Sequence, residues 1–156
     1  AFKELHYDVA VVVDSDAPED FSEDDAIALT GKDICVVMWE GEFSIEQRVF
    51  SDLPWDGVLK GFELALSLNP EPKRVLDQVR SKYGSGFESD VGNWIKSEGL
   101  RDALGRAAKS SNWFKSVTKG KQWADSVVPH ISDLGVDTDL RAQLEKLRVW
   151  VDRDAG

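Results

Sequence analysis

Two aspartates follow an apolar run close to the start of the chain. Residues Val9–Val13 lead directly into Asp14, Ser15 and Asp16. Residues two apart in an extended chain point to the same side, so both carboxylates can face one point. Two crowded carboxylates repel unless a cation neutralises them, and Mg²⁺ prefers oxygen ligands. The pattern therefore indicates a divalent-metal site at Asp14 and Asp16. The other interpretation is an acidic loop that only solvates the chain and caps the next helix.

A second apolar run, residues 34–39, precedes two further carboxylates. Glu40 follows this run directly, and Glu46 lies in the first turn of the next expected helix. We expect that helix to begin at Ser44, because Ser44 and Gln47 have capping-box spacing. In open α/β sheets, functional groups gather at the carboxyl ends of the strands. If the two runs form neighbouring strands, Glu40 or Glu46 opens towards the same pocket as the aspartates.

The segment from residue 9 to residue 39 reads as strand, helix, strand. The runs 9–13 and 34–39 are continuous and rich in β-branched residues, which is typical of strands covered on both faces. Between them we expect a helix that opens at Pro18 or Ser22 and is closed by Gly31. A strand–helix–strand unit of this length predicts that the two strands are parallel.

Beyond a break at residues 69–72, the sequence contains no convincing strand. Helical spacing of apolar residues recurs over 73–84, 88–99, 100–111, 123–131 and 138–153. We therefore predict an α/β fold with a parallel sheet. Its core occupies residues 1–70, and a mostly helical C-terminal extension occupies residues 71–156.

The charge of the chain is negative and uneven. The 156 residues include 19 Lys or Arg against 29 Asp or Glu, a formal net charge of −10. This balance argues against broad, non-specific binding to nucleic acid. Residues 8–25 hold eight carboxylates and no basic residue, whereas residues 96–121 hold seven basic residues and two acidic ones. An acidic pole and a basic segment are compatible with metal chemistry on a phosphate polymer, and equally with ordinary solubility.

Several features exclude other classes of protein. No apolar run approaches the roughly 20 residues that span a bilayer, and the start lacks the order of a signal peptide, so we expect a cytoplasmic protein with no membrane partner. Cys35 is the single cysteine and is expected to be a buried free thiol. His6 and His130 lack metal-ligand spacing and are interpreted as structural or surface residues. There is no P-loop, and about four or five of the tryptophans are expected in the core.

Three stretches resemble the later part of a Toprim domain, in particular that of the OLD-family, ATPase-linked nucleases. These stretches are VVVDSD, MWEGEFSIEQRVFSDLPWDGV and AAKSSNWFKSV, and the resemblance covers roughly residues 9–117. It implies that Asp14 and Asp16 are the metal-binding pair of the family. It also implies that Glu46 is the assisting glutamate after the following strand, and that Lys115 is the later lysine that stabilises the reaction at phosphate.

The sequence departs from the Toprim pattern at its beginning. A Toprim domain starts with a strand that ends in a Glu, which is usually a metal ligand or a general acid or base. Only residues 1–8 precede the aspartate strand here, so this first element is missing. That is expected of an excised portion of a larger protein, or of a chain whose missing part another chain supplies.

The resemblance implies metal-assisted hydrolysis of phosphodiesters with Mg²⁺ or Mn²⁺. The leading hypothesis is the endonuclease or nickase portion of an ATPase-coupled system that acts on DNA, in phage defence or DNA repair. Its partners would be DNA, an ATPase domain or subunit supplied elsewhere, and a second copy in a homodimer. The alternative is a non-catalytic interaction or dimerisation domain that keeps the fold with a degenerate site. The missing Glu and the negative charge favour this alternative.

Overall fold

The computed structural model describes residues 8–153, which belong to two compact units. The first, here called the strand unit, contains the residues up to Ile45 and those from Val136 onward. The second, the helical unit, is Glu46–Gly135. This division differs from the predicted boundary at residue 70, because the C-terminal helix joins the strands and the helices after residue 45 group with the later ones.

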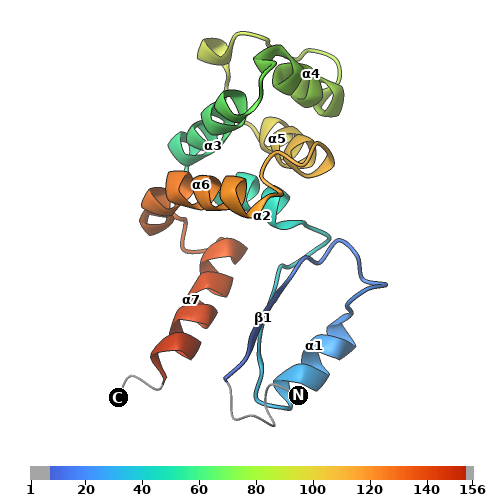
Figure 1. The fold of residues 1–156 in the computed structure, drawn as a ribbon, viewed down its shortest axis with the longest axis vertical. Coiled ribbons are helices and arrows are strands. Elements are labelled where there is room, and N and C mark those ends of the chain that lie inside the picture. The colour runs from blue at the N-terminus through green and yellow to red at the C-terminus, as the bar shows by residue number, and fades with distance from the viewer. Residues whose placement is uncertain (1–7, 154–156) are drawn as a thin grey trace. The chain divides into compact units, whose positions relative to one another are not determined.

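The strand unit is built on two parallel strands. β1 (Ala10–Val13) pairs with β2 (Cys35–Met38), and α1 (Glu23–Thr30) connects them in sequence. The predicted parallel pairing is confirmed. Figure 1 shows α1 and α7 (Asp139–Asp152) on either side of the strand pair, and both helices pack on β2. The fold is therefore mixed α/β with a small parallel sheet.

The two strands differ in how well they are covered. Val36 and Val37 of β2 are buried, but Val12 of β1 is 53% exposed. The expectation that both strands are covered on both faces is therefore wrong for β1. The physical reason is that α1 and α7 pack chiefly on β2. Cys35, at the start of β2, is half-buried rather than buried.

Ser22 is the N-cap of α1. It is one of the two residues, with Pro18, at which the sequence predicted that this helix begins. Its hydroxyl accepts a hydrogen bond from the Asp25 backbone N–H, and its own backbone N–H donates to the Asp25 carboxylate, which completes a capping box. The hydrogen bonds from the Ser22 side chain and backbone hold the pKa of Asp25 below its ordinary value. Gly31 closes the helix as predicted.

The helical unit contains five α-helices among the described residues. They are α2 (Ile45–Asp52), α3 (Trp55–Leu68), α4 (Pro72–Tyr83), α5 (Glu98–Ser110) and α6 (Val117–Val127). The first residue of α2, Ile45, belongs to the strand unit. A 3₁₀ segment, η3 (Val128–Asp133), follows α6 and contains Pro129.

The helix predicted over residues 88–99 does not form. Only a short 3₁₀ turn, η2 (Val91–Asn93), occurs there. The Glu88 carboxylate accepts the Asp90 backbone N–H, and the Asp90 carboxylate accepts the Gly92 backbone N–H. These local bonds satisfy the backbone in a turn, which competes with the helix that the apolar spacing suggested.

Aromatic side chains form the core of the helical unit. Phe114 stacks on Trp123 with ring centroids 4.5 Å apart, and Phe50 contacts both Trp113 and Trp123. Three tryptophans are buried, Trp39, Trp113 and Trp123, which is fewer than the sequence suggested. The rest of the tryptophans are partly exposed and contribute one apolar face.

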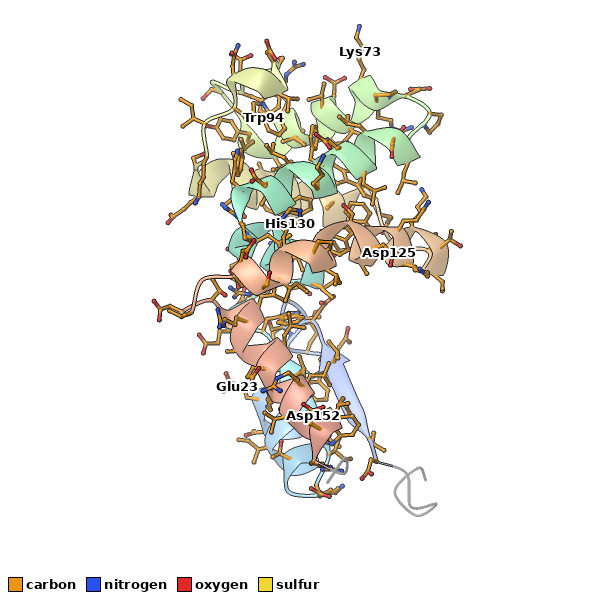
Figure 2. The ribbon with its side chains drawn as sticks, turned by 90° about the vertical axis from the view of Figure 1, so that its left-hand side faces the viewer. Glu23, Lys73, Trp94, Asp125, His130 and Asp152 are labelled. Carbon is orange, nitrogen blue, oxygen red and sulfur yellow. The ribbon has the colours of Figure 1, made fainter. Side chains whose placement is uncertain are left out.

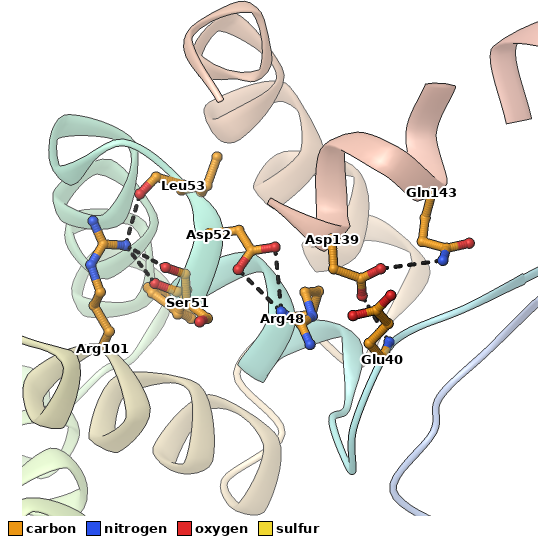
Figure 3. Close-up of polar contacts among 9 residues, drawn as sticks. Glu40, Arg48, Ser51, Asp52, Leu53, Arg101, Asp139 and Gln143 are labelled. Carbon is orange, nitrogen blue, oxygen red and sulfur yellow. Dashed lines mark hydrogen bonds and ion pairs between the residues drawn. The ribbon is translucent and has the colours of Figure 1, made fainter. Parts of the chain in front are cut away.

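α2 is held in the helical unit by α5. The Arg101 guanidinium donates to the backbone carbonyls of Phe50, Ser51 and Leu53 at 2.7–3.0 Å, at the end of α2 (Figure 3). These are carbonyls that a helix end leaves without intrahelical partners. Burial lowers the pKa of Arg101, while nearby Asp52 raises it, and an arginine stays charged at neutral pH.

α5 approaches α2 closely at Gly105. A Cβ atom built on Gly105 would lie 2.6 Å from the Gln47 Cα, which is shorter than real contacts allow. Gly99, on the same helix, would place its Cβ no closer than 3.8 Å to Tyr83. Only the first glycine is therefore required for packing.

We predict opposite effects for alanine at these two glycines. Gly105→Ala forces α2 and α5 apart and should destabilise the protein by about 1–3 kcal/mol. Gly99→Ala should be neutral or stabilise it by up to about 1 kcal/mol, because alanine favours helix. Urea unfolding followed by circular dichroism measures both. Equal stability of the two variants would contradict the close approach of α2 and α5.

Candidate functional site at the carboxyl ends of the strands

Asp14 is the first residue after β1, and its side chain caps the N-terminus of α2, the helix that follows β2 in sequence. Its Oδ1 accepts a hydrogen bond from the Ile45 backbone N–H at 2.7 Å. Ile45 is the first residue of α2. An acidic side chain at this place satisfies one of the N–H groups that a helix start leaves unpaired, and it complements the positive end of the helix dipole.

Ser15 joins the loop after β1 to the loop after β2. Its backbone N–H donates to the Phe43 carbonyl at 3.0 Å, and its hydroxyl donates to the same carbonyl at 3.2 Å. The Phe43 backbone N–H in turn donates to the Ser15 hydroxyl at 3.1 Å. Asp14, Ser15, Phe43 and Ile45 are here called the loop clamp. The clamp fixes the Asp-Ser-Asp segment against residues 43–45.

The predicted site residues fall into two groups. Asp14 and Asp16 lie in the clamped loop, with Asp14 exposed and Asp16 half-buried. Glu46 directly follows Ile45 in sequence and is half-buried in the first turn of α2. Lys115 is an exposed residue of the helical unit. It directly follows the buried Trp113 and Phe114 in sequence.

The backbone at Glu40, just after β2, is bonded to the start of α7. Its backbone N–H donates to the Asp139 carboxylate at 2.9 Å, and Asp139 also accepts from the Gln143 side chain (Figure 3). These contacts hold the residue at the end of β2 against the start of α7.

No three side chains of the His, Cys, Asp and Glu types are arranged to hold a metal ion within residues 8–153. A complete protein cage is therefore not formed there. Mg²⁺ seldom uses such a cage, because it usually keeps several waters and binds through one or two carboxylates together with substrate phosphates. The donor set of Asp14 and Asp16 fits that mode.

A cavity of about 420 Å³ opens at the same edge of the strand unit. Its lining includes Ser15 and Phe21 from the segment after β1, Met38 and Trp39 at the end of β2, and the acidic residues Glu23, Glu40 and Glu42. Neither aspartate lines it. Sequence reasoning missed both this cavity and the role of Ser15, although a serine placed between two strand-end aspartates is a common partner for nearby backbone groups.

His130 and part of the basic segment are engaged in packing or ion pairs within the helical unit. His130 lies against α3, where a Cβ added to Gly57 would meet its Cβ at 3.0 Å (Figure 2). His6 lies outside the described residues. In the basic segment, Arg101 is buried, and Arg106 and Lys121 pair with Asp102 and Asp125. Part of the positive charge expected for DNA is thus neutralised within the protein.

No family model, curated protein or solved structure matches this chain. Among the helices of residues 8–153, none is long and apolar enough to cross a membrane. The assignment of a function therefore rests on the residues at the strand ends and on the contacts that position them.

We predict that Ser15→Ala weakens the loop clamp. The variant loses the hydroxyl that both donates to and accepts from Phe43, which should cost about 1–2 kcal/mol of stability. Amide exchange at Phe43 and Ile45 should also become faster. The control is Thr30→Ala, which removes an exposed hydroxyl bonded only within α1 and should change stability by less than about 0.5 kcal/mol.

Denaturant unfolding and hydrogen exchange read out this comparison. If Ser15→Ala matched Thr30→Ala in stability and left the exchange at Phe43 and Ile45 unchanged, the clamp would have no role in holding the two loops.

Proposed function

We propose that this chain is the later part of a Toprim-like, metal-dependent DNA nuclease domain that works with an ATPase domain or subunit. The observation that carries the proposal is the loop clamp. It fixes two aspartates at the carboxyl end of a parallel strand beside the first residue of α2, and Glu46 comes next in the sequence. Such an edge is where α/β proteins commonly place their functional groups.

In this proposal, Asp14 and Asp16 hold Mg²⁺ or Mn²⁺ through carboxylate oxygens. The ion, when bound, neutralises phosphate charge and orients a water. Oδ1 of Asp14 already accepts the Ile45 N–H, so the clamp orients this carboxylate before any ligand arrives. The Toprim resemblance assigns an assisting role to Glu46 and the supply of positive charge for the phosphate of DNA to the exposed Lys115, both of which belong to the helical unit.

A second candidate function is a non-catalytic interaction or dimerisation domain. Two observations favour it: residues 8–153 contain no group of three metal-ligating side chains, and at least three of the seven basic residues of the basic segment are engaged within the protein. A domain of this kind would bind neither metal nor DNA.

The first test is thermal unfolding with and without Mn²⁺. Binding at a dissociation constant of about 1 mM would stabilise the folded state by about 1.4 kcal/mol at 10 mM metal, which is roughly 3–6 °C. Asp14→Asn should lose this shift while it keeps an oxygen that accepts the Ile45 N–H. Asp24→Asn, an exposed change in α1, should keep the shift. A wild-type protein that does not respond to Mn²⁺ would favour the non-catalytic domain.

The second test is nicking of supercoiled plasmid in Mn²⁺. We expect Asp14→Asn and Asp16→Asn to reduce the rate by about 10²-fold or more, because each removes a carboxylate from the charge-stabilising site. Asp24→Asn serves again as the matched control. If the wild-type protein nicks DNA no faster than Asp14→Asn, the nuclease assignment is wrong for this chain.

A further inference from the structure

The outer edge of β1 carries backbone groups that no neighbouring strand pairs. The Val9 carbonyl accepts the Cys35 N–H, and Ala10 and Val12 are in register with Cys35 and Val37. In a parallel ladder of this register, Val9, Val11 and Val13 bond towards β2, while Ala10 and Val12 direct their N–H and C=O groups outward. Within residues 8–153, those outward groups have no hydrogen-bond partner.

The outer edge of β2 is treated differently. The same alternation directs the Val36 carbonyl outward, and the Lys146 ammonium from α7 donates to it at 2.5 Å. A lysine placed on a strand edge is a common device for blocking further strand pairing. On β1 the described residues provide no such block, and Val12 is 53% exposed. One edge of this sheet is therefore closed and the other is open.

An open edge of this composition is costly to leave unpaired. A two-stranded sheet is marginal in water, and parallel sheets are normally covered on both sides. A third strand would satisfy the outward groups of Ala10 and Val12 and cover the exposed Val12 side chain. The edge is short, apolar and β-branched, which favours an extended polypeptide as its occupant.

The charges beside the edge decide which polypeptide fits. A second copy paired antiparallel about Val11 would set Asp8 opposite Asp14, and like charges directly opposite are unfavourable. It would also bring together two acidic stretches, each with eight carboxylates in residues 8–25. Asp8, which pairs with Arg153, lies at one end of the edge, and the acidic Asp14-Ser15-Asp16 segment lies at the other.

We propose that the β1 edge binds an extended segment of a partner polypeptide by strand addition. The segment has apolar side chains along its length and Lys or Arg at the end that lies beside Asp14 and Asp16. Its backbone pairs with Ala10 and Val12. This inference concerns the metal-free protein, in which the carboxylates of Asp14 and Asp16 keep their negative charge, and it uses only the strand edge and those charges.

The experiment uses a short acetylated peptide of alternating Val and Thr that ends in Lys-Lys, and the same peptide ending in Glu-Glu. Amide exchange is followed by NMR at Ala10 and Val12. The Lys-Lys peptide should slow exchange at these two amides by about tenfold or more. The Glu-Glu peptide should have a markedly smaller effect, because it places carboxylates beside Asp14 and Asp16.

Two variants that each replace an exposed apolar residue with lysine distinguish peptide binding at the β1 edge from a general effect of added positive charge. Val12→Lys changes an exposed residue on the edge and should weaken binding of the Lys-Lys peptide by about tenfold or more. Ile27→Lys changes a 70% exposed residue on α1 and should leave that binding within about twofold.

Three results would overturn the proposal. The first is unchanged exchange at Ala10 and Val12 with the Lys-Lys peptide. The second is equal binding of the Glu-Glu peptide. The third is slow exchange at these amides in the protein alone that becomes faster on dilution, since this would show that a second copy occupies the edge.

Discussion

The loop clamp is the set of hydrogen bonds that organises the carboxyl ends of the two strands. One serine hydroxyl and one aspartate oxygen fix the loop after β1 to the loop after β2, through Phe43 and Ile45. Both loops leave the carboxyl ends of parallel strands, so the clamp determines which side chains the sheet edge presents. Without these bonds, Asp14 and Asp16 would belong to an ordinary solvated acidic loop, with no fixed geometry for binding a metal ion.

In the strand unit, the clamped loops belong to a two-stranded sheet in which the outer edge of β1 is unpaired. β2 is covered by α1 and α7 and its outer carbonyl is capped by Lys146, whereas β1 keeps an open edge. The helical unit is completed internally by an aromatic core and by the Arg101 contacts to the end of α2. The features that invite a ligand or a partner therefore lie in the strand unit, where the acidic residues of the sequence are also concentrated.

Local rules predicted the elements well and the long-range grouping poorly. The apolar runs gave both strands, and Ser22 and Gly31 gave the ends of α1, because these depend on neighbours in sequence. The helix at 88–99 failed because the Glu88 and Asp90 carboxylates bond nearby backbone, which apolar spacing cannot reveal. The joining of α7 to β2 and the contact of Ser15 with Phe43 connect residues far apart in the chain, so no local pattern indicated them.

Paramagnetic broadening of amide NMR signals by substoichiometric Mn²⁺ tests the central claim most directly. If the clamped aspartates form the metal site, the signals of residues 14–16 and 43–46 should broaden first. Residues 19–25, which carry more carboxylates in an exposed stretch, should then respond only at higher metal. Broadening that begins at residues 19–25, or that spreads evenly over all exposed carboxylates, would contradict the claim that the clamp builds a metal site.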